Sequence, residues 1–346
     1  MTTPPAVVDT AVVKRLAWLD LSSVQQRYER REGAELKYDY VVSNIGLEYR
    51  RFLFLRLMYP DLDIAPPPRI AAYWRLHAAD RVAFDADRAA VAVATPSSAD
   101  RLVPPSGPVD DPASFSKDST VRDLYAATFP CGSAEVWGWP DLMPGHRNSA
   151  PSLGLVHRRL AGAIDDCTRA RLLTEARQRR AMITEWHDDG YYCSARRGTV
   201  NSPMRSCSAT PGQVLLDVHW SDAIPRLIAA ETGVVVVPTA ASYLYYRSGD
   251  FLGIHTDGYA LELTLLTLLS GAVEPLDCHL HLADASLEEI KALAETAGGL
   301  PAGGTPFGIS TEPFLLSGQR IPHQRGPRDR DEETVVLCQN YAVLVP

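Results

Sequence analysis

Two His-X-Asp sequences contain the residues of this chain whose types and spacing could bind a metal ion. They lie at His187–Asp189 and at His255–Asp257. Residues at positions i and i+2 of a strand point to the same face of a sheet. An imidazole nitrogen and a carboxylate oxygen at this spacing can therefore bind one ion, although so short a motif also arises by chance.

The sequence around each motif favours His255 over His187 as a metal ligand. His187 follows a predicted Arg-rich helix, Ala163–Thr184, and precedes Gly190, so it falls at a predicted corner between a helix and a strand. Histidine and aspartate are common at such corners as caps and turn formers, and we expect a structural role there. His255, by contrast, ends a short apolar strand that follows a Gly-Asp turn.

A third ligand is expected from a distant strand, and His323 is the candidate. It follows the Ser-Gly turn at 317–318 and precedes the last predicted strand. Two histidines and one carboxylate that leave other positions open form the facial triad of non-haem Fe(II) sites. On spacing alone, two structural histidines and a turn aspartate remain an open alternative. The His-X-His pair at 279–281 has no third partner of matching position, so we expect it to be structural.

The elements that must position these residues are short and rich in Val, Leu, Tyr and Thr, with Gly, Pro and Asp between them. Many short strands in the second half of the chain predict a sandwich or jelly roll. One helix is expected after a capping box, Ser286–Glu289. The predicted strands are Gln213–Val218, Val234–Val237, Ser242–Arg247, Leu252–Thr256, Glu262–Leu269, His279–Leu282, Glu312–Leu316 and Thr334–Leu344.

The first part of the chain has a different residue pattern. Apolar residues recur at helical spacing over Asp9–Leu21, Val41–Met58 and Arg69–Ala90. The segment Ala94–Ser119 is dense in Pro, Ser and Asp and poor in large apolar side chains, as in a linker or long surface loop. We therefore expect a helical domain over residues 1–93, a linker over 94–119 and a β domain over 120–346.

Composition narrows the possible classes of protein. The 346 residues are 46% hydrophobic and 22% charged, as in a globular protein. A net charge of −8 argues against a protein that coats nucleic acid. No signal peptide and no membrane-length apolar run is visible, so we expect a cytoplasmic protein without a membrane partner. The six cysteines form no Cys-X-X-Cys, so buried reduced thiols are favoured over a thiolate zinc site.

Residues 234–344 resemble the catalytic core of the Fe(II)- and 2-oxoglutarate-dependent dioxygenases. The matching sequences are Tyr-X-X-Gly-Asp-X-Leu-X-X-His-X-Asp over Tyr246–Asp257 and Ser-Gly-X-X-Ile-Pro-His over Ser317–His323. The resemblance implies an α+β protein with a double-stranded β-helix (jelly roll) core and a helical N-terminal domain. It also implies Fe(II) bound by His255, Asp257 and His323, with 2-oxoglutarate as cosubstrate and O₂ as oxidant. The expected reaction is hydroxylation of an unactivated C–H bond in an amino acid, a peptide or a secondary metabolite.

The chain departs from this family in the residue that binds the far carboxylate of 2-oxoglutarate. Most members carry an Arg on the strand after the distal His, but Asp331–Pro346 contains no Arg or Lys. Arg325, two residues past His323, is our first candidate, because an extended segment keeps it on the same side. The other candidates are Arg330 and the hydroxyl of Tyr245, with Arg320, Arg328, Arg247 and Arg205 as further possible anchors.

Two further interpretations remain open. The same barrel could be a non-enzymatic binding protein, or a zinc hydrolase that uses the triad to activate water.

The front of the chain, at Glu48–Leu53, Tyr59-Pro60 and Tyr73–His77, is faintly similar to bacterial helical domains related to the glycine-rich-domain proteins. Arg75 replaces a His of that pattern. We expect this part to be a scaffold or a docking module for a partner.

Overall fold

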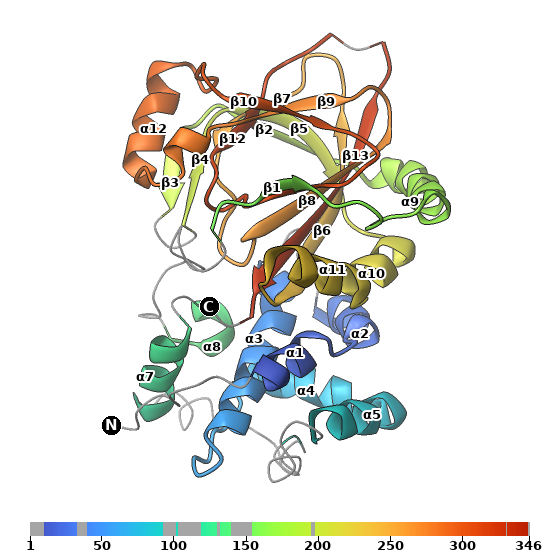
Figure 1. The fold of residues 1–346 in the computed structure, drawn as a ribbon, viewed down its shortest axis with the longest axis vertical. Coiled ribbons are helices and arrows are strands. Elements are labelled where there is room, and N and C mark those ends of the chain that lie inside the picture. Colours follow the sequence, from blue (N-terminus) through green and yellow to red (C-terminus); the bar gives the residue numbers. More distant parts are fainter. Residues whose placement is uncertain are drawn as a thin grey trace.

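Antiparallel strands form one curled sheet in the second half of the chain, with helices packed below it (Figure 1). The computed structural model describes residues 10–32, 40–92, 102, 119–129, 132–139, 154–194, 198–329 and 331–344. The strands of the curled sheet are β1 (His157–Arg159), β2 (Thr184–Asp188), β5 (Met204–Ala209), β6 (Val236–Tyr246), β7 (Phe251–His255), β8 (Leu263–Ser270), β9 (Glu274–Cys278), β10 (Thr305–Ile309), β11 (Phe314–Leu316), β12 (His323–Arg325) and β13 (Thr334–Val343).

The order of the strands is that of a double-stranded β-helix. Along the sheet it runs β1-β11-β8-β13-β6-β5-β7-β12-β9-β10, with β2 paired to β5. One half holds β11, β8, β13 and β6, the other holds β7, β12, β9 and β10, and β5 pairs with both β6 and β7. Every pair is antiparallel, and consecutive strands from β6 to β9 and from β10 to β13 alternate between the two halves through short connections. This topology confirms the predicted jelly roll.

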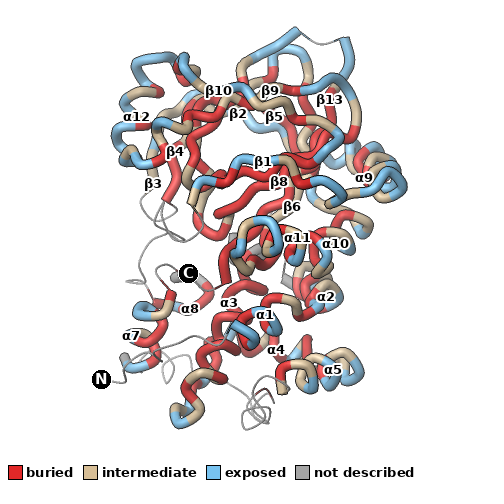
Figure 2. The backbone as a smooth tube through the Cα atoms, in the orientation of Figure 1, coloured by how far each residue is buried: buried red, intermediate tan, exposed pale blue. Residues whose placement is uncertain are grey.

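Alternation along the strands separates the interior of the barrel from its outer faces. On β8, Leu266 and Leu268 point into the barrel, where they pack with Tyr246, Leu276 and Val336. Residues of opposite parity on the same sheet pack against helices outside. Both faces of β6, β8 and β13 are therefore buried (Figure 2), which explains why these strands read as nearly continuous apolar runs.

Helices cover the sheet and form the lower part of the molecule (Figure 1). The helices are α1 (Thr10–Ala17), α2 (Ser22–Glu32), α3 (Tyr40–Met58), α4 (Pro68–Ala79), α5 (Arg81–Ala92), α7 (Ser119–Thr128), α8 (Ala134–Trp137), α9 (Asp166–Arg179), α10 (Gln213–Trp220), α11 (Ala223–Thr232) and α12 (Leu287–Thr296). A separate hairpin pairs β3 (Tyr192–Ser194) with β4 (Thr199–Asn201). No helix in the described ranges is long and apolar enough to cross a membrane.

The N-terminal helices share one hydrophobic core with the barrel. Their apolar residues pack with Val237, Tyr259, Ala260, Ala342 and Leu344 of the β domain. Most of the predicted linker, 94–119, and with it the predicted domain boundary, lies outside the described residues.

Several predictions about elements were wrong, each for a local reason. Gln213–Val218 is not a strand but the start of α10, because Leu215 and His219 are buried at helical spacing. His279–Leu282 contains a 3₁₀ turn rather than a strand. The single helix predicted over Arg69–Ala90 is two helices, α4 and α5, which break at Asp80. The capping box of α12 is present as predicted, with Ser286 and Glu289 bonded to each other's backbone N–H.

Candidate metal centre

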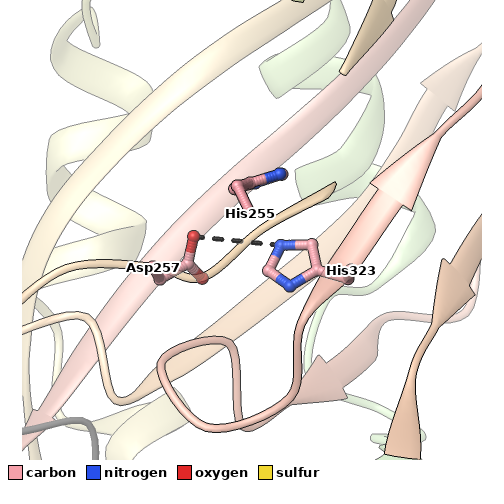
Figure 3. A group of neighbouring side chains, drawn as sticks. All are labelled: His255, Asp257 and His323. Atoms are coloured by element: carbon pink, nitrogen blue, oxygen red, sulfur yellow. Dashed lines mark ion pairs between the residues drawn. The ribbon is translucent and has the colours of Figure 1, made fainter. Parts of the chain in front are cut away.

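The three predicted ligands come together at one end of the barrel. His255 is the last residue of β7, Asp257 follows two residues later, and His323 is the first residue of β12. The two histidines are partners across these antiparallel strands. One ligand atom from each of the three residues lies within 4.8 Å of the other two. Figure 3 shows the side chains gathered around a common point.

Backbone carbonyls hold both imidazoles in the same tautomer. His255 Nδ1 lies 2.9 Å from the carbonyl of Gly253, and His323 Nδ1 lies 2.9 Å from the carbonyl of Ile321. A carbonyl only accepts, so each Nδ1 carries the proton and each Nε2 offers a lone pair. Metal-binding histidines are oriented in this way. His323 Nε2 lies 3.9 Å from Asp257 Oδ1.

The environment keeps His255 in the form that binds metal. Burial, and then the neighbouring His323, lower its pKa to about 4. Both causes disfavour the imidazolium, the first by desolvation and the second by repulsion between like charges. At neutral pH the ring is therefore uncharged, so a metal ion does not have to displace a proton from it.

The carboxylate of Asp257 is fixed by groups that the sequence interpretation did not single out. Its Oδ2 accepts a hydrogen bond from the hydroxyl of Thr264, which lies 2.9 Å from the side-chain amide of Asn340. Its backbone N–H donates to the carbonyl of Gly318 over 3.0 Å. A Cβ at Gly318 would overlap the Asp257 carboxylate, so this approach requires glycine. The sequence feature that could have pointed to these contacts is the presence of polar Thr264 and Asn340 within otherwise apolar strands.

This donor set fits a divalent transition metal. Two imidazole nitrogens and one carboxylate oxygen converge from one side and leave the remaining coordination positions to other molecules. Each of the three side chains is also oriented by a hydrogen bond to a carbonyl or a hydroxyl, as the residues that bind a metal usually are. No other group of three His, Cys, Asp or Glu side chains within the described ranges has this geometry.

Arg325 lies deeper in the barrel than the triad. It is buried on the inner face of β12, and its Nη1 lies 3.5 Å from Glu274 of β9. Its guanidinium packs over the ring of Tyr246, and Glu274 also accepts from the hydroxyl of Thr334 over 3.2 Å. A step of two residues along an extended strand spans about 6.5 Å. The backbones of His323 and Arg325 lie about one such step apart, with a register shift against β7 between them, and the guanidinium itself is buried.

Tyr245, a predicted cosubstrate contact, points the other way. Its hydroxyl donates to the carbonyl of Ala176 in α9 over 2.6 Å, and that of Tyr243 donates to Glu175 of the same helix. Alternation along β6 turns Tyr246 into the barrel and Tyr245 outward. The prediction was wrong because the sequence marks the alternation of this strand but not which of its two apolar faces lines the interior.

The remaining candidates are arginines at least partly exposed, apart from one that is not described, and Arg328 is exposed. Arg320 pairs with Asp284, Arg247 with Glu185, and Arg205 with Asp250. Arg330 lies outside the described residues.

The rejected histidine motifs also lack the geometry of a metal site. His187 lies within β2 rather than at a corner, and its exposed ring contacts Asp189 over 3.2 Å. His279 and His281, on a turn, have ring centroids 5.7 Å apart.

A scan against protein-family models found no match, and neither did a search of curated protein sequences. Solved structures do match. Four of them, including AviO1 from Streptomyces viridochromogenes, each cover 54–57% of this chain. An oxidoreductase of the 2OG-Fe(II) oxygenase family from Burkholderia pseudomallei is 13% identical, is covered over 88% of its length and gives a TM-score of 0.35. A prolyl-4-hydroxylase from Pseudomonas putida is 15% identical, covered over 94%, with a TM-score of 0.34. HygX from Streptomyces hygroscopicus, solved with nickel and 2-oxoglutarate, is 11% identical, covered over 84%, with a TM-score of 0.39.

These structures are similar to this chain over little more than half of its length. At these identities and scores the likeness is distant. The chemistry of the site therefore rests on the residues of this chain.

Proposed function

We propose that this protein is a non-haem Fe(II)- and 2-oxoglutarate-dependent oxygenase. The observation that carries the proposal is the convergence of His255, Asp257 and His323, one ligand atom of each lying within 4.8 Å of the others. Both histidines present Nε2 inward because their Nδ1 atoms face carbonyls. Bound Fe(II) would supply the activation of O₂ that oxidation of a C–H bond requires.

Arg325 is the proposed partner of the far carboxylate of 2-oxoglutarate. A dicarboxylate that enters a mostly apolar barrel needs a fixed cation at its inner end. Arg325 is buried and lies two residues after His323 on β12. Glu274 already pairs with the Arg325 guanidinium, but a guanidinium has five N–H donors and can bind a second carboxylate at the same time.

The proposed reaction is hydroxylation of an unactivated C–H bond, and the proposed substrates are an amino acid, a peptide or a secondary metabolite. Asp257 supports oxygen insertion, since the related halogenases have no carboxylate at this position. The apolar lining of the barrel beyond the triad, with Leu266, Leu268 and Phe314, would exclude water from the inner end of the site.

Turnover of 2-oxoglutarate without a substrate tests this proposal. The full-length protein, purified without oxygen and loaded with Fe(II), is expected to convert 2-oxoglutarate to succinate in the presence of O₂, and the His255→Ala variant is not. Metal analysis of the protein as purified separates the rival functions. Zinc at one ion per chain without succinate would favour a hydrolase, whereas no metal and no succinate would favour a binding protein.

A further inference from the structure

A buried ion pair in the helical part of the chain contacts the loop that carries Asp257. Glu48 and Arg51 lie one turn apart on α3, both essentially unexposed, with Arg51 Nη1 3.5 Å from Glu48 Oε1. Tyr259, two residues after Asp257, inserts its hydroxyl between them. That hydroxyl donates to Glu48 and accepts from Arg51 Nη1 over 2.6 Å.

The carboxylate of Glu48 is satisfied by several segments at once. It accepts from the Tyr125 hydroxyl over 2.6 Å, from the Trp137 indole over 2.7 Å and from the Ser133 backbone N–H over 3.0 Å. We call Glu48, Arg51, Tyr125, Ser133, Trp137 and Tyr259 the Glu48 cluster. Only Tyr259 among its members belongs to the barrel. A buried ion pair is weak evidence of a role in stability, because apolar packing at the same place often stabilises as well.

The loop between β7 and β8 is held at two points within a very short span. The backbone of Asp257 is bonded to Gly318, and two residues further on the side chain of Tyr259 is fixed in the Glu48 cluster. Ala260 comes next with φ +64°, a left-handed conformation that no other non-glycine residue in the described ranges adopts. Its carbonyl accepts from the hydroxyl of Thr239 over 2.8 Å. Such a conformation persists where the surrounding contacts impose it.

We infer that the Glu48 cluster is a positioning device for the metal centre: it holds Tyr259 and thereby sets the orientation of the Asp257 carboxylate. The inference rests on the proposed function, since it assigns Asp257 as a metal ligand. It gives the helical part of the chain a role in the chemistry, although none of its residues reaches the triad. Tyr259 is accordingly a positioning residue and not a catalytic one.

The affinity for Co(II) tests this role without turnover, and Tyr259→Phe in the full-length chain is the informative variant. It removes one hydroxyl and keeps the ring in the shared core. Loss of a group that orients a metal ligand typically lowers affinity about 10- to 100-fold. We expect the dissociation constant for Co(II) to rise at least about tenfold, and the Co(II) absorption bands, which report ligand geometry, to shift.

Tyr49→Phe is the matched control. Tyr49 lies on the same helix as Glu48, is as buried as Tyr259, and loses a hydrogen bond to His77 Nδ1 at 2.9 Å, in α4 and not in the Asp257 loop. The melting temperature of Tyr49→Phe is expected to fall, while its affinity for Co(II) stays within threefold of the parent. A second variant, Glu48→Gln, keeps the shape of the side chain and is expected to weaken Co(II) binding as Tyr259→Phe does.

The outcomes separate the two proposals. Tight Co(II) binding by the parent with an unchanged constant in both Tyr259→Phe and Glu48→Gln would overturn the positioning role and leave the proposed function intact. Equal weakening in Tyr259→Phe and Tyr49→Phe would overturn it too, because the effect would then come from general loosening of the core. If the parent bound no Co(II), the proposed function would fail and the positioning role with it.

Discussion

His255 and His323 face each other across β7 and β12 with ring centroids 4.3 Å apart, and both are oriented in the same way. Each Nδ1 contacts the carbonyl of the residue two positions earlier in the chain. Two separate strands thus share the same local arrangement, which leaves both Nε2 atoms free to bind a metal ion. This symmetry is what a metal ion held between two strands requires.

Removing any one ligand should abolish metal binding while leaving the fold intact. His255→Ala, Asp257→Ala and His323→Ala are each expected to lose Fe(II) or Co(II) stoichiometry, because two ligands do not form a facial triad. Metal content after gel filtration and the far-ultraviolet circular dichroism spectrum measure the two properties. His187→Ala, in the exposed motif on β2, is the control and should bind one metal ion per chain. Retention of metal by His255→Ala together with its loss in His187→Ala would refute the assignment.

Gly318→Ala should weaken metal binding without altering a ligand. The added Cβ overlaps the Asp257 carboxylate and presses on Thr264, so the carboxylate must move. We expect the affinity for Co(II) to fall at least about tenfold, as for loss of other contacts that orient a ligand. Gly326→Ala is the control, because no atom lies within 4 Å of the position that its new methyl group would take, and its φ is not left-handed. Equal affinities in the two variants would contradict the proposed role of this close approach.

Arg325 should decide the affinity for 2-oxoglutarate and have little effect on the metal. Loss of one partner of a buried charge pair costs about 2–5 kcal/mol, which is well over tenfold in affinity. We therefore expect Arg325→Ala to raise the apparent constant for 2-oxoglutarate more than tenfold, with Fe(II) binding nearly unchanged. Arg320→Ala, which removes a partner of Asp284 at the surface, should change it less than threefold.

The pair of Arg325 with Glu274 requires a second comparison, since Arg325→Ala leaves that carboxylate buried beside a lost cation. Arg325→Met combined with Glu274→Gln removes both charges and should restore thermal stability without restoring 2-oxoglutarate binding. Glu274→Gln alone should bind 2-oxoglutarate at least as tightly as the parent, because the guanidinium is no longer shared. Normal binding by the double variant would place the anchor elsewhere.

His219 should make the protein sensitive to acid. Burial lowers its pKa to about 3, below the ordinary value of 6.5. Between these two values the unfolded chain binds a proton that the native chain does not, so the free energy of unfolding falls as the pH falls. The slope from one such group is at most about 1.4 kcal/mol per pH unit.

Urea denaturation of the metal-free protein between pH 6.5 and pH 4 measures this slope. His219→Gln is expected to reduce it, whereas His187→Gln, which removes an exposed imidazole, should leave it as in the parent. An unchanged slope in His219→Gln would show that other groups cause the acid sensitivity.

The sequence by itself predicted the three residues of the candidate metal centre and most of the strands that carry them. His255 ends an apolar strand, Asp257 follows two residues later, and His323 precedes the last strand. This local order does not depend on how the strands are arranged in the barrel. The capping box at Ser286 was equally readable, because both of its partners lie within one turn. Where the sequence offers only a short apolar run, as in α10, the spacing of the apolar residues does not distinguish a strand from a helix.

Only the tertiary structure decided which side chains face the site. Tyr245 and Tyr246 are adjacent residues of the same type, yet Tyr245 bonds to α9 and Tyr246 lines the barrel. Both faces of β6 are buried, so the alternation of side chains along the strand does not show which face lies inside. The same holds for Tyr259, whose hydroxyl meets Glu48, 211 residues earlier in the chain. Contacts of this kind depend on how distant elements pack, and no local pattern in the sequence encodes them.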